Sequence, residues 1–194
     1  MNDIQASRLL PLLFEQIDEN LPLTVLDFGP AQPETIHFLS DFHCKLHVVD
    51  LYADLPLEVQ EGDEDSEDSS LGQRMEEALM LPGGALFDIC LFWDVLNFMS
   101  RDAVKILAGK LRPHLHPQSR AHAFAVHNPK TPAAQTCHGI IDSNHISRRP
   151  RPVQPPNYQP HNQGELGLLL RYFQVERSVL IPDKRIEVLM TAVL

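Results

Sequence analysis

The sequence predicts an α/β fold in which a doubly wound, mostly parallel sheet is covered by helices on both faces and closes with a C-terminal antiparallel hairpin. Apolar, strand-like runs alternate with helix-like segments along most of the chain, as in sheets built from β-α-β units. Residues 174–194 instead hold two apolar runs joined at Pro182-Asp183-Lys184, which is a hairpin pattern. The 194 residues suffice for a single domain with a sizeable core, so we expect one domain over 1–194.

The first part of the chain predicts a helix followed by a β-α-β unit. Apolar residues at helical spacing predict an amphipathic helix over residues 4–19. The runs "LTVLDF" (23–28) and "KLHVVDLY" (45–52) are almost continuously apolar, as expected of strands buried on both faces. Between them, "PETIHFLSDF" (33–42) predicts a helix, because its initial proline and glutamate suit a first turn.

The alternation continues toward the C-terminus. The pattern predicts a helix over 71–81, a strand over 85–98, a helix over 100–115, a strand over 121–128 and a helix over 165–173. Ser100 is placed to cap its helix. Val104, Leu107 and Leu111 fall on one face of the same helix, which predicts that this face is buried.

Two segments depart from this pattern. The charged run "EGDEDSEDSS" (61–70) predicts a mobile acidic linker. Residues 129–163 hold seven prolines and four basic residues without clear periodicity, which predicts a long Pro-rich loop that is a lid or disordered. Its basic run "SRRPR" (147–151) is either a solvated loop or a site for an acidic substrate or partner, including the chain's own acidic linker.

Charge and cysteine content argue against several classes of function. The formal net charge is −10, which disfavours nucleic acid as a partner because nothing offsets phosphate repulsion. Three widely separated cysteines without a C-x-x-C pair argue against a disulfide framework and favour a cytoplasmic protein. Neither a signal peptide nor a membrane span is predicted. The ten histidines show no ordinary ligand spacing, so we predict no metal site.

The order of these elements resembles the class I S-adenosylmethionine-dependent methyltransferase superfamily. In that family the first strand ends in an acid-x-Gly-x-Gly-x-Gly turn. Here "LDFGPAQP" matches at Asp27 and Gly29, whereas Ala31 and Pro33 occupy the second and third glycine positions, so the motif is divergent and degenerate. The family's second strand ends in an acid that binds the ribose hydroxyls, and "LHVVD" places Asp50 there.

The rest of the resemblance lies toward the C-terminus. The run "FDICLFWDVLNF" resembles the family's fourth strand, and "ELGLLLRYFQVERSVL" with the hairpin after it resembles the final helix and strands. The Pro-Gly-Gly turn that usually follows the fourth helix is reduced to a proline in "LRPHLHPQS". The family's third strand is not identifiable: "PLEVQ" (56–60) is a fragment of it, or the strand is missing.

The resemblance implies a Rossmann-like fold that binds S-adenosylmethionine. The cofactor-binding residues that it implies are Asp27, Gly29, Ala31, Asp50, Leu51, Trp93 and Asp94. Prolines in the turn remove N–H donors that a pyrophosphate needs, which disfavours NAD, FAD and ATP. S-adenosylmethionine carries no phosphate, and its amino and sulfonium groups suit Asp27 and Glu34. Structural roles remain as alternatives: Asp27 as an acceptor at a strand end, Asp50 as a helix cap and Trp93 as packing.

Two functions remain open at this point. The first is methyl transfer to a small-molecule or protein acceptor, favoured by the retained Asp27, Gly29 and Asp50. The second is a catalytically inactive, methyltransferase-like pseudoenzyme that acts as a binding or regulatory module, with a protein as its partner. The altered turn, the unidentified third strand and the lost Pro-Gly-Gly turn favour this second function. We assign no catalytic residue, because His127 and Tyr158 suit structural or surface roles better than that of a general base.

Overall fold

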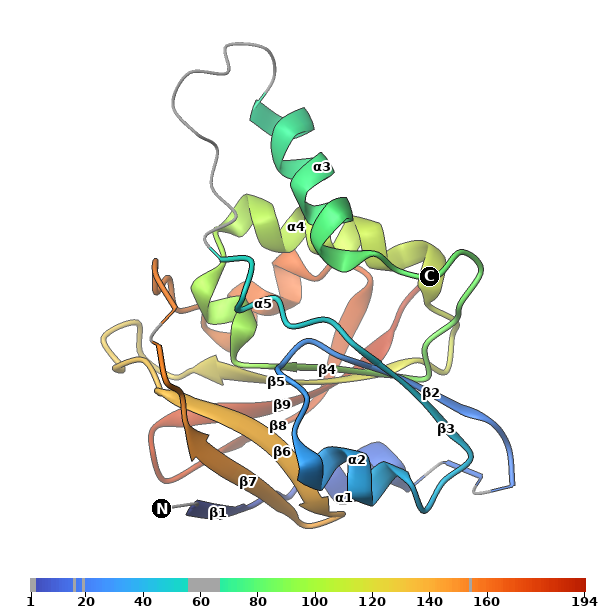
Figure 1. The fold of residues 1–194 in the computed structure, drawn as a ribbon. Coiled ribbons are helices and arrows are strands. Elements are labelled where there is room, and N and C mark those ends of the chain that lie inside the picture. The colour runs from blue at the N-terminus through green and yellow to red at the C-terminus, as the bar shows by residue number, and fades with distance from the viewer. Residues whose placement is uncertain (1–2, 16, 19, 56–66, 154) are drawn as a thin grey trace.

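The computed structural model describes residues 3–15, 17–18, 20–55, 67–153 and 155–194, which form an α/β fold built on two sheets (Figure 1). Across the larger sheet the strands are β3 (Cys44–Val48), β2 (Leu23–Asp27), β4 (Ile89–Trp93), β5 (Arg120–Val126), β9 (Arg185–Ala192) and β8 (Phe173–Leu180). The pairs among β3, β2, β4 and β5 are parallel, and β9 pairs antiparallel with both β5 and β8. This confirms the mostly parallel sheet and its C-terminal antiparallel hairpin.

Helices cover both faces of the larger sheet. One face carries α3 (Glu67–Leu79), α4 (Arg101–Leu111) and α5 (Gln163–Leu169), and the other carries α1 (Leu10–Phe14) and α2 (Pro33–Leu39) (Figure 1). The short 3-10 turns η1 (Val95–Phe98) and η2 (Arg112–His114) follow β4 and α4. Strand side chains alternate between the two layers: Leu26 and Phe92 pack with α3–α5, whereas Val25 packs with α1 and α2. Burial on both faces accounts for the continuous apolar run of β2. The same expectation for β3 was wrong: among the described strands it lies at the sheet edge, and none of its residues is fully buried.

Several predicted elements are confirmed to within a few residues. Ser100 caps α4, since its Oγ accepts a hydrogen bond of 3.2 Å from the Ala103 backbone N–H. Val104, Leu107 and Leu111 are all buried, as their spacing predicted. The strand expected over 45–52 ends at Val48, so Asp50 lies in the turn after the strand. Residues 56–60 and 61–66 lie outside the described residues, and residues 67–70 begin α3. Within the described ranges, only β2 pairs with β3.

The prediction of a long loop over 129–163 was wrong. Strands β6 (Thr136–Asp142) and β7 (His145–Pro150) form an antiparallel hairpin there, and β1 (Asp3–Ala6) pairs with β7 to complete a three-stranded sheet (Figure 1). The sequence does not show the alternation of apolar and polar residues that is typical of strands, because the hairpin buries polar side chains, including His138 and Ser147. A strand whose buried positions are polar lacks the apolar alternation by which strands are recognised.

The prediction of a helix over residues 4–19 was also wrong. Pairing with β7 makes Asp3–Ala6 a strand, and the helix that follows is limited to α1. Ser7 separates the two elements, because its Oγ accepts hydrogen bonds from the backbone N–H groups of Leu9 (3.2 Å) and Leu10 (2.9 Å). Sheet pairing therefore prevails over the helical spacing of the apolar residues.

Strand β6 packs directly on the start of α2. The Ile140 backbone N–H donates to Thr35 Oγ1 at 3.0 Å. A Cβ on Gly139 would lie 2.9 Å from Gln32 Cβ and 2.9 Å from Ser147 Oγ. Glycine is therefore required where β6 crosses the turn between β2 and α2, and the two sheets meet at this turn.

We predict that Gly139→Ala lowers the free energy of unfolding by about 1–3 kcal/mol, because the added methyl group forces β6 and Gln32 apart. Gly109→Ala is the matched control: nothing lies within 4 Å of its Cβ position, and alanine in α4 should stabilise the protein by up to about 1 kcal/mol. Urea unfolding measures both variants. Equal stability of Gly139→Ala and the unsubstituted protein would show that β6 does not pack on the turn.

Candidate functional site

The carboxyl ends of β2 and β4 lie side by side in the sheet, at the place where open α/β folds bind ligands. Asp27 ends β2 and Trp93 ends β4, and the two side chains meet. Asp50 and Asp94 follow β3 and β4 at the same edge. Ala31 is exposed on the turn, and Leu51 is buried in the core with Leu26 and Phe28. The edge therefore brings together Asp27, Gly29, Trp93, Asp94 and Asp50, while Leu51 points into the core.

The indole of Trp93 covers the carboxylate of Asp27. Its Nε1–H donates to Asp27 Oδ1 at 2.7 Å, and the Gly29 backbone N–H donates to the same oxygen at 2.9 Å. Asp27 and Trp93 are each only 1% exposed. A Cβ on Gly29 would lie 3.1 Å from Trp93 Cδ1. The glycine of the turn thus makes room for the protein's own indole.

The backbone at the end of β4 is unusual. Trp93 has a φ of +50°, which is uncommon for a bulky residue, and the pairing with β5 shifts register between Leu91 and Trp93. Such strain persists where surrounding contacts fix a conformation, and it gathers at functional sites. Here it aims the indole across the edge toward Asp27.

Burial also changes the ionisation of Asp27. Desolvation raises the pKa of its carboxyl to about 7, although the hydrogen bonds from Gly29 and Trp93 act in the opposite direction. Near neutral pH a large fraction of Asp27 is therefore uncharged. A neutral, covered carboxyl is a poor partner for a ligand's ammonium group.

The hairpin β6–β7 forms a second layer over Trp93. The His138 ring lies nearly parallel to the indole, with centroids 5.6 Å apart and 13° between the planes. Its Nε2 lies 3.4 Å from Arg185 Nη1, and its Nδ1 lies 3.6 Å from Asp94 Oδ1. Desolvation lowers the pKa of His138 well below its usual value, and the guanidinium of Arg185 lowers it further. The imidazole is consequently neutral.

A buried polar cluster joins the hairpin to the larger sheet. Arg151, just after β7, stacks over the Tyr52 ring with its Cζ 3.5 Å from the centroid, and its Nη2 lies 3.5 Å from Asp94 Oδ1. The Tyr52 hydroxyl donates to the same carboxylate oxygen. Burial raises the pKa of Asp94, whereas Arg151 opposes that rise. Of these residues, Asp94 was predicted from the sequence, and Arg151 lies in the basic run noted there. Tyr52 and His138 were not predicted as site residues, because neither carries a local signal.

A cavity of about 570 Å³ opens over Asp50. Its walls are the turn at Pro30 and Gln32, the loop residues Asp50, Tyr52, Ala53 and Leu55, Cys137 of β6, and residues 149–153, 155 and 156. The half-buried Asp50 carboxylate accepts a hydrogen bond of 3.2 Å from the Tyr52 backbone N–H. Burial raises the pKa of Asp50. Apolar walls around a few polar groups, at this volume, are typical of small-molecule sites.

The residues at this edge fit one half of S-adenosylmethionine and not the other. Asp50 faces a cavity wide enough for a nucleoside, as its expected role requires. The acids expected to meet the amino and sulfonium groups are engaged elsewhere: Asp27 lies beneath Trp93, and Glu34 Oε1 accepts from Arg149 Nε at 3.0 Å. In the conformation described here, neither acid can therefore meet the methionine arm without giving up these contacts.

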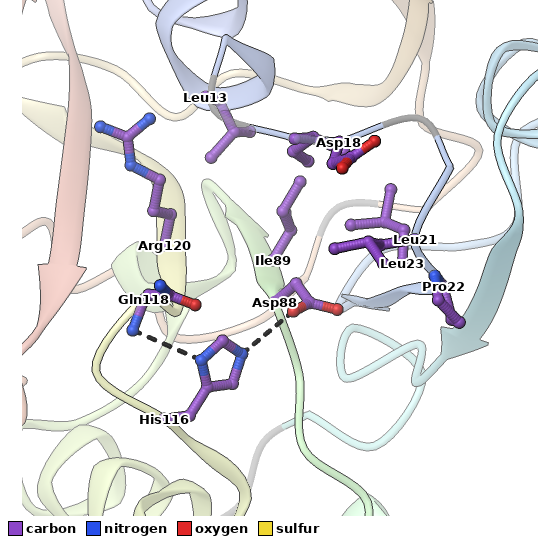
Figure 2. Close-up of a pocket in the computed structure, with 11 residues that line it drawn as sticks. Leu13, Asp18, Leu21, Pro22, Leu23, Asp88, Ile89, His116, Gln118 and Arg120 are labelled. Carbon is purple, nitrogen blue, oxygen red and sulfur yellow. Dashed lines mark hydrogen bonds and ion pairs between the residues drawn. The ribbon is translucent and has the colours of Figure 1, made fainter.

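A second cavity, of about 300 Å³, lies at the opposite, amino-terminal edge of the sheet (Figure 2). His116 Nε2 lies 3.0 Å from Asp88 Oδ1, and the Gln118 backbone N–H donates to His116 Nδ1 at 3.3 Å. Asp88 also accepts from the Thr24 backbone N–H at 2.7 Å. These polar groups satisfy one another, and the cavity contains none of the predicted site residues, so we assign the candidate site to the carboxyl edge.

Within the described part of the chain, no group of three or more His, Cys, Asp or Glu side chains is arranged to hold a metal ion. Among the helices of that part, none combines the length and apolar character needed to cross a bilayer.

We predict that between pH 5 and pH 8 the unsubstituted protein loses, relative to Asp27→Asn, on the order of 2 kcal/mol of its free energy of unfolding. The direction follows from the raised pKa of Asp27. Between about pH 4 and pH 7 this carboxyl is ionised in the unfolded chain but keeps its proton in the native state. The native state therefore loses stability as the pH rises. Asparagine keeps an acceptor oxygen for Trp93 and Gly29. Urea unfolding at both pH values measures the difference, and a pH-independent difference would place Asp27 in contact with solvent.

No protein-family model and no curated protein matches the chain. Among solved structures it is similar to the Burkholderia thailandensis 1,6-didemethyltoxoflavin-N1-methyltransferase with bound S-adenosylhomocysteine (TM-score 0.54, 18% identity, 96% of this chain and 78% of that chain). It is also similar to Streptomyces venezuelae DesVI, with a TM-score of 0.52, 11% identity, and coverage of 95% of this chain and 89% of that chain. A TehB-like methyltransferase of Corynebacterium glutamicum gives a TM-score of 0.50, 9% identity, and coverage of 95% of this chain and 87% of that chain. At these identities the likeness concerns the fold alone: the chain has the Rossmann-like fold of S-adenosylmethionine-dependent methyltransferases.

Proposed function

We propose that this chain is a methyltransferase-like binding module, which holds a nucleoside-type ligand over Asp50 and does not transfer methyl groups in the conformation described here. One observation carries the proposal: the Asp27 carboxylate is 1% exposed beneath the Trp93 indole, at the position where a methyl donor's amino group was expected. This proposal is the second of the two functions that the sequence left open, a catalytically inactive, methyltransferase-like module. Its partner is a small molecule or a protein.

Methyl transfer depends mainly on aligning donor and acceptor, because the donor is already activated. The acceptor must reach the donor's methyl group at the carboxyl edge of the sheet. In this protein that edge is occupied by His138 on β6 and by the Arg151–Asp94–Tyr52 cluster. Donor and acceptor would both have to displace buried, hydrogen-bonded side chains, which is costly.

The cavity over Asp50 supports the binding half of the proposal. It combines a half-buried carboxylate, which can accept hydrogen bonds from ribose hydroxyls, with apolar walls from Leu55 and five prolines. The similar Burkholderia thailandensis enzyme was solved with S-adenosylhomocysteine, an adenosine derivative. An adenosine-type ligand is therefore the natural first probe.

A second candidate function is S-adenosylmethionine-dependent methyl transfer to a small-molecule or protein acceptor. The retention of both acids, Asp27 and Asp50, at one edge favours it. In that case Trp93 and β6 would have to move away from Asp27 on ligand binding. The net charge of −10 still disfavours nucleic acid as the acceptor.

Calorimetric titration with adenosine, S-adenosylhomocysteine and S-adenosylmethionine separates the two functions. We expect the three ligands to bind with similar affinity, because the methionine arm gains no contact. Asp50→Asn should weaken all three by about 1–3 kcal/mol, since hydrogen bonds to a charged group are lost. Asp27→Asn should change none of them.

Two outcomes would contradict this proposal. In the first, S-adenosylhomocysteine binds at least about 100-fold more tightly than adenosine, a difference of about 2.7 kcal/mol, and Asp27→Asn abolishes this difference. That result would support the methyltransferase. Absence of binding by all three at millimolar concentration would remove Asp50 from any nucleoside site.

A further inference from the structure

The three-stranded sheet has an open edge at β1. This strand pairs on one side with β7, from Asp3↔Arg148 to Ala6↔His145, and no other described strand pairs with it. An open edge presents unpaired N–H and C=O groups, which proteins often protect with lysine, proline or a bulge. β1 reads Asp-Ile-Gln-Ala and has none of these, and Ile4 is 63% exposed.

A cavity of about 720 Å³ follows this edge. All four residues of β1 line it, and so do residues 179–184 at the turn between β8 and β9. Successive side chains of a strand point to opposite faces, so a cavity that touches four consecutive residues runs along the strand's edge. We call it the β1 groove. Its far wall is apolar, and Leu180 on that wall is 61% exposed.

The free charges in the β1 groove are positive. Arg8 and Lys184 are exposed, and the side chain of neither pairs with any residue in the described ranges. Each acid of the groove already has a basic neighbour: Asp183 Oδ2 lies 2.5 Å from Arg185 Nη2, and Glu187 Oε1 lies 2.9 Å from His122 Nε2. Asp3, whose side chain is 73% exposed, lies 3.7 Å from Arg148 Nη1. The groove therefore offers two unpaired cations in a chain whose net charge is −10.

We propose that the β1 groove binds an extended, acidic segment of a partner protein, which adds a fourth strand to the small sheet. Main-chain hydrogen bonds to the edge of β1 would supply affinity, and alternate side chains would supply specificity. Carboxylates on one face meet Arg8 and Lys184, while apolar side chains on the other face contact Leu180. This interaction lies apart from the cavity over Asp50 and does not depend on it.

Fluorescence anisotropy with a labelled synthetic peptide that alternates glutamate and valine tests the proposal. The double variant Arg8→Glu/Lys184→Glu should bind this peptide at least about tenfold more weakly, since two attractive contacts become repulsive. Lys45→Glu/Lys130→Glu is the matched control: it makes the same change in net charge at two exposed residues outside the groove. We expect that control to bind within about twofold of the unsubstituted protein, and amide exchange across Ile4–Ala6 to slow in the complex.

Four results would overturn the proposal. Equal weakening by both double variants would indicate a general charge effect. Equal binding of a lysine–valine peptide, or no binding of either peptide, would remove the acidic partner. In sedimentation, a concentration-dependent dimer that Arg8→Glu/Lys184→Glu abolishes would make the groove an interface between copies of this chain.

Discussion

The hydrogen bond from the Trp93 indole to the Asp27 carboxylate is the contact on which the rest of the site depends. It joins the ends of two adjacent parallel strands and fixes Trp93 in a positive-φ conformation. It also fills the space beside Gly29 and places the indole under His138. A glycine turn that elsewhere gives a ligand close access to the backbone here gives that access to a side chain of the same protein.

A layer of buried polar groups holds the small sheet against this edge. Ile140 and Ile146 supply apolar contacts with the α1–α2 side of the core, but His138, Ser147 and Arg151 are buried as well. Ser147 Oγ and Arg151 Nη2 donate to backbone carbonyl oxygens, and His138 Nε2 lies against Arg185. His138 Nδ1 and Arg151 Nε have no hydrogen-bond partner among the described residues. Buried polar contacts of this kind contribute modest net stability, yet they penalise any arrangement that leaves a member unpaired. We infer that they fix where β6 and β7 lie, and hence how much of the ligand site stays open.

The sequence predicted those parts of the fold in which local pattern and burial agree. β2 and β4 are largely apolar on both faces, and Ser100 with its buried leucines marks α4 unambiguously. The small sheet escaped prediction because its buried positions carry His138, Gly139 and Ser147, whose pattern resembles that of a loop. β1 escaped because its strand character comes from pairing with a segment about 140 residues away, which no local rule detects.

The same distinction applies to the site. The positions of Asp27, Asp50 and Trp93 follow from their places at strand ends, so the sequence could locate them. Whether Asp27 is open to a ligand depends on Trp93 from β4 and His138 from β6, and these contacts exist only in the folded chain. The proposed binding function therefore rests on the burial of Asp27, which residue identity alone does not reveal.

Trp93 is the chain's single tryptophan, so its fluorescence reports directly on the covered edge. The measurement is acrylamide quenching together with the emission maximum, before and after millimolar S-adenosylmethionine. We predict a blue-shifted emission and slow quenching relative to the urea-unfolded chain, both unchanged by the ligand, because the indole stays buried on Asp27. An indole quenched as readily as in the unfolded chain, or one that becomes accessible when the ligand is added, would contradict the account.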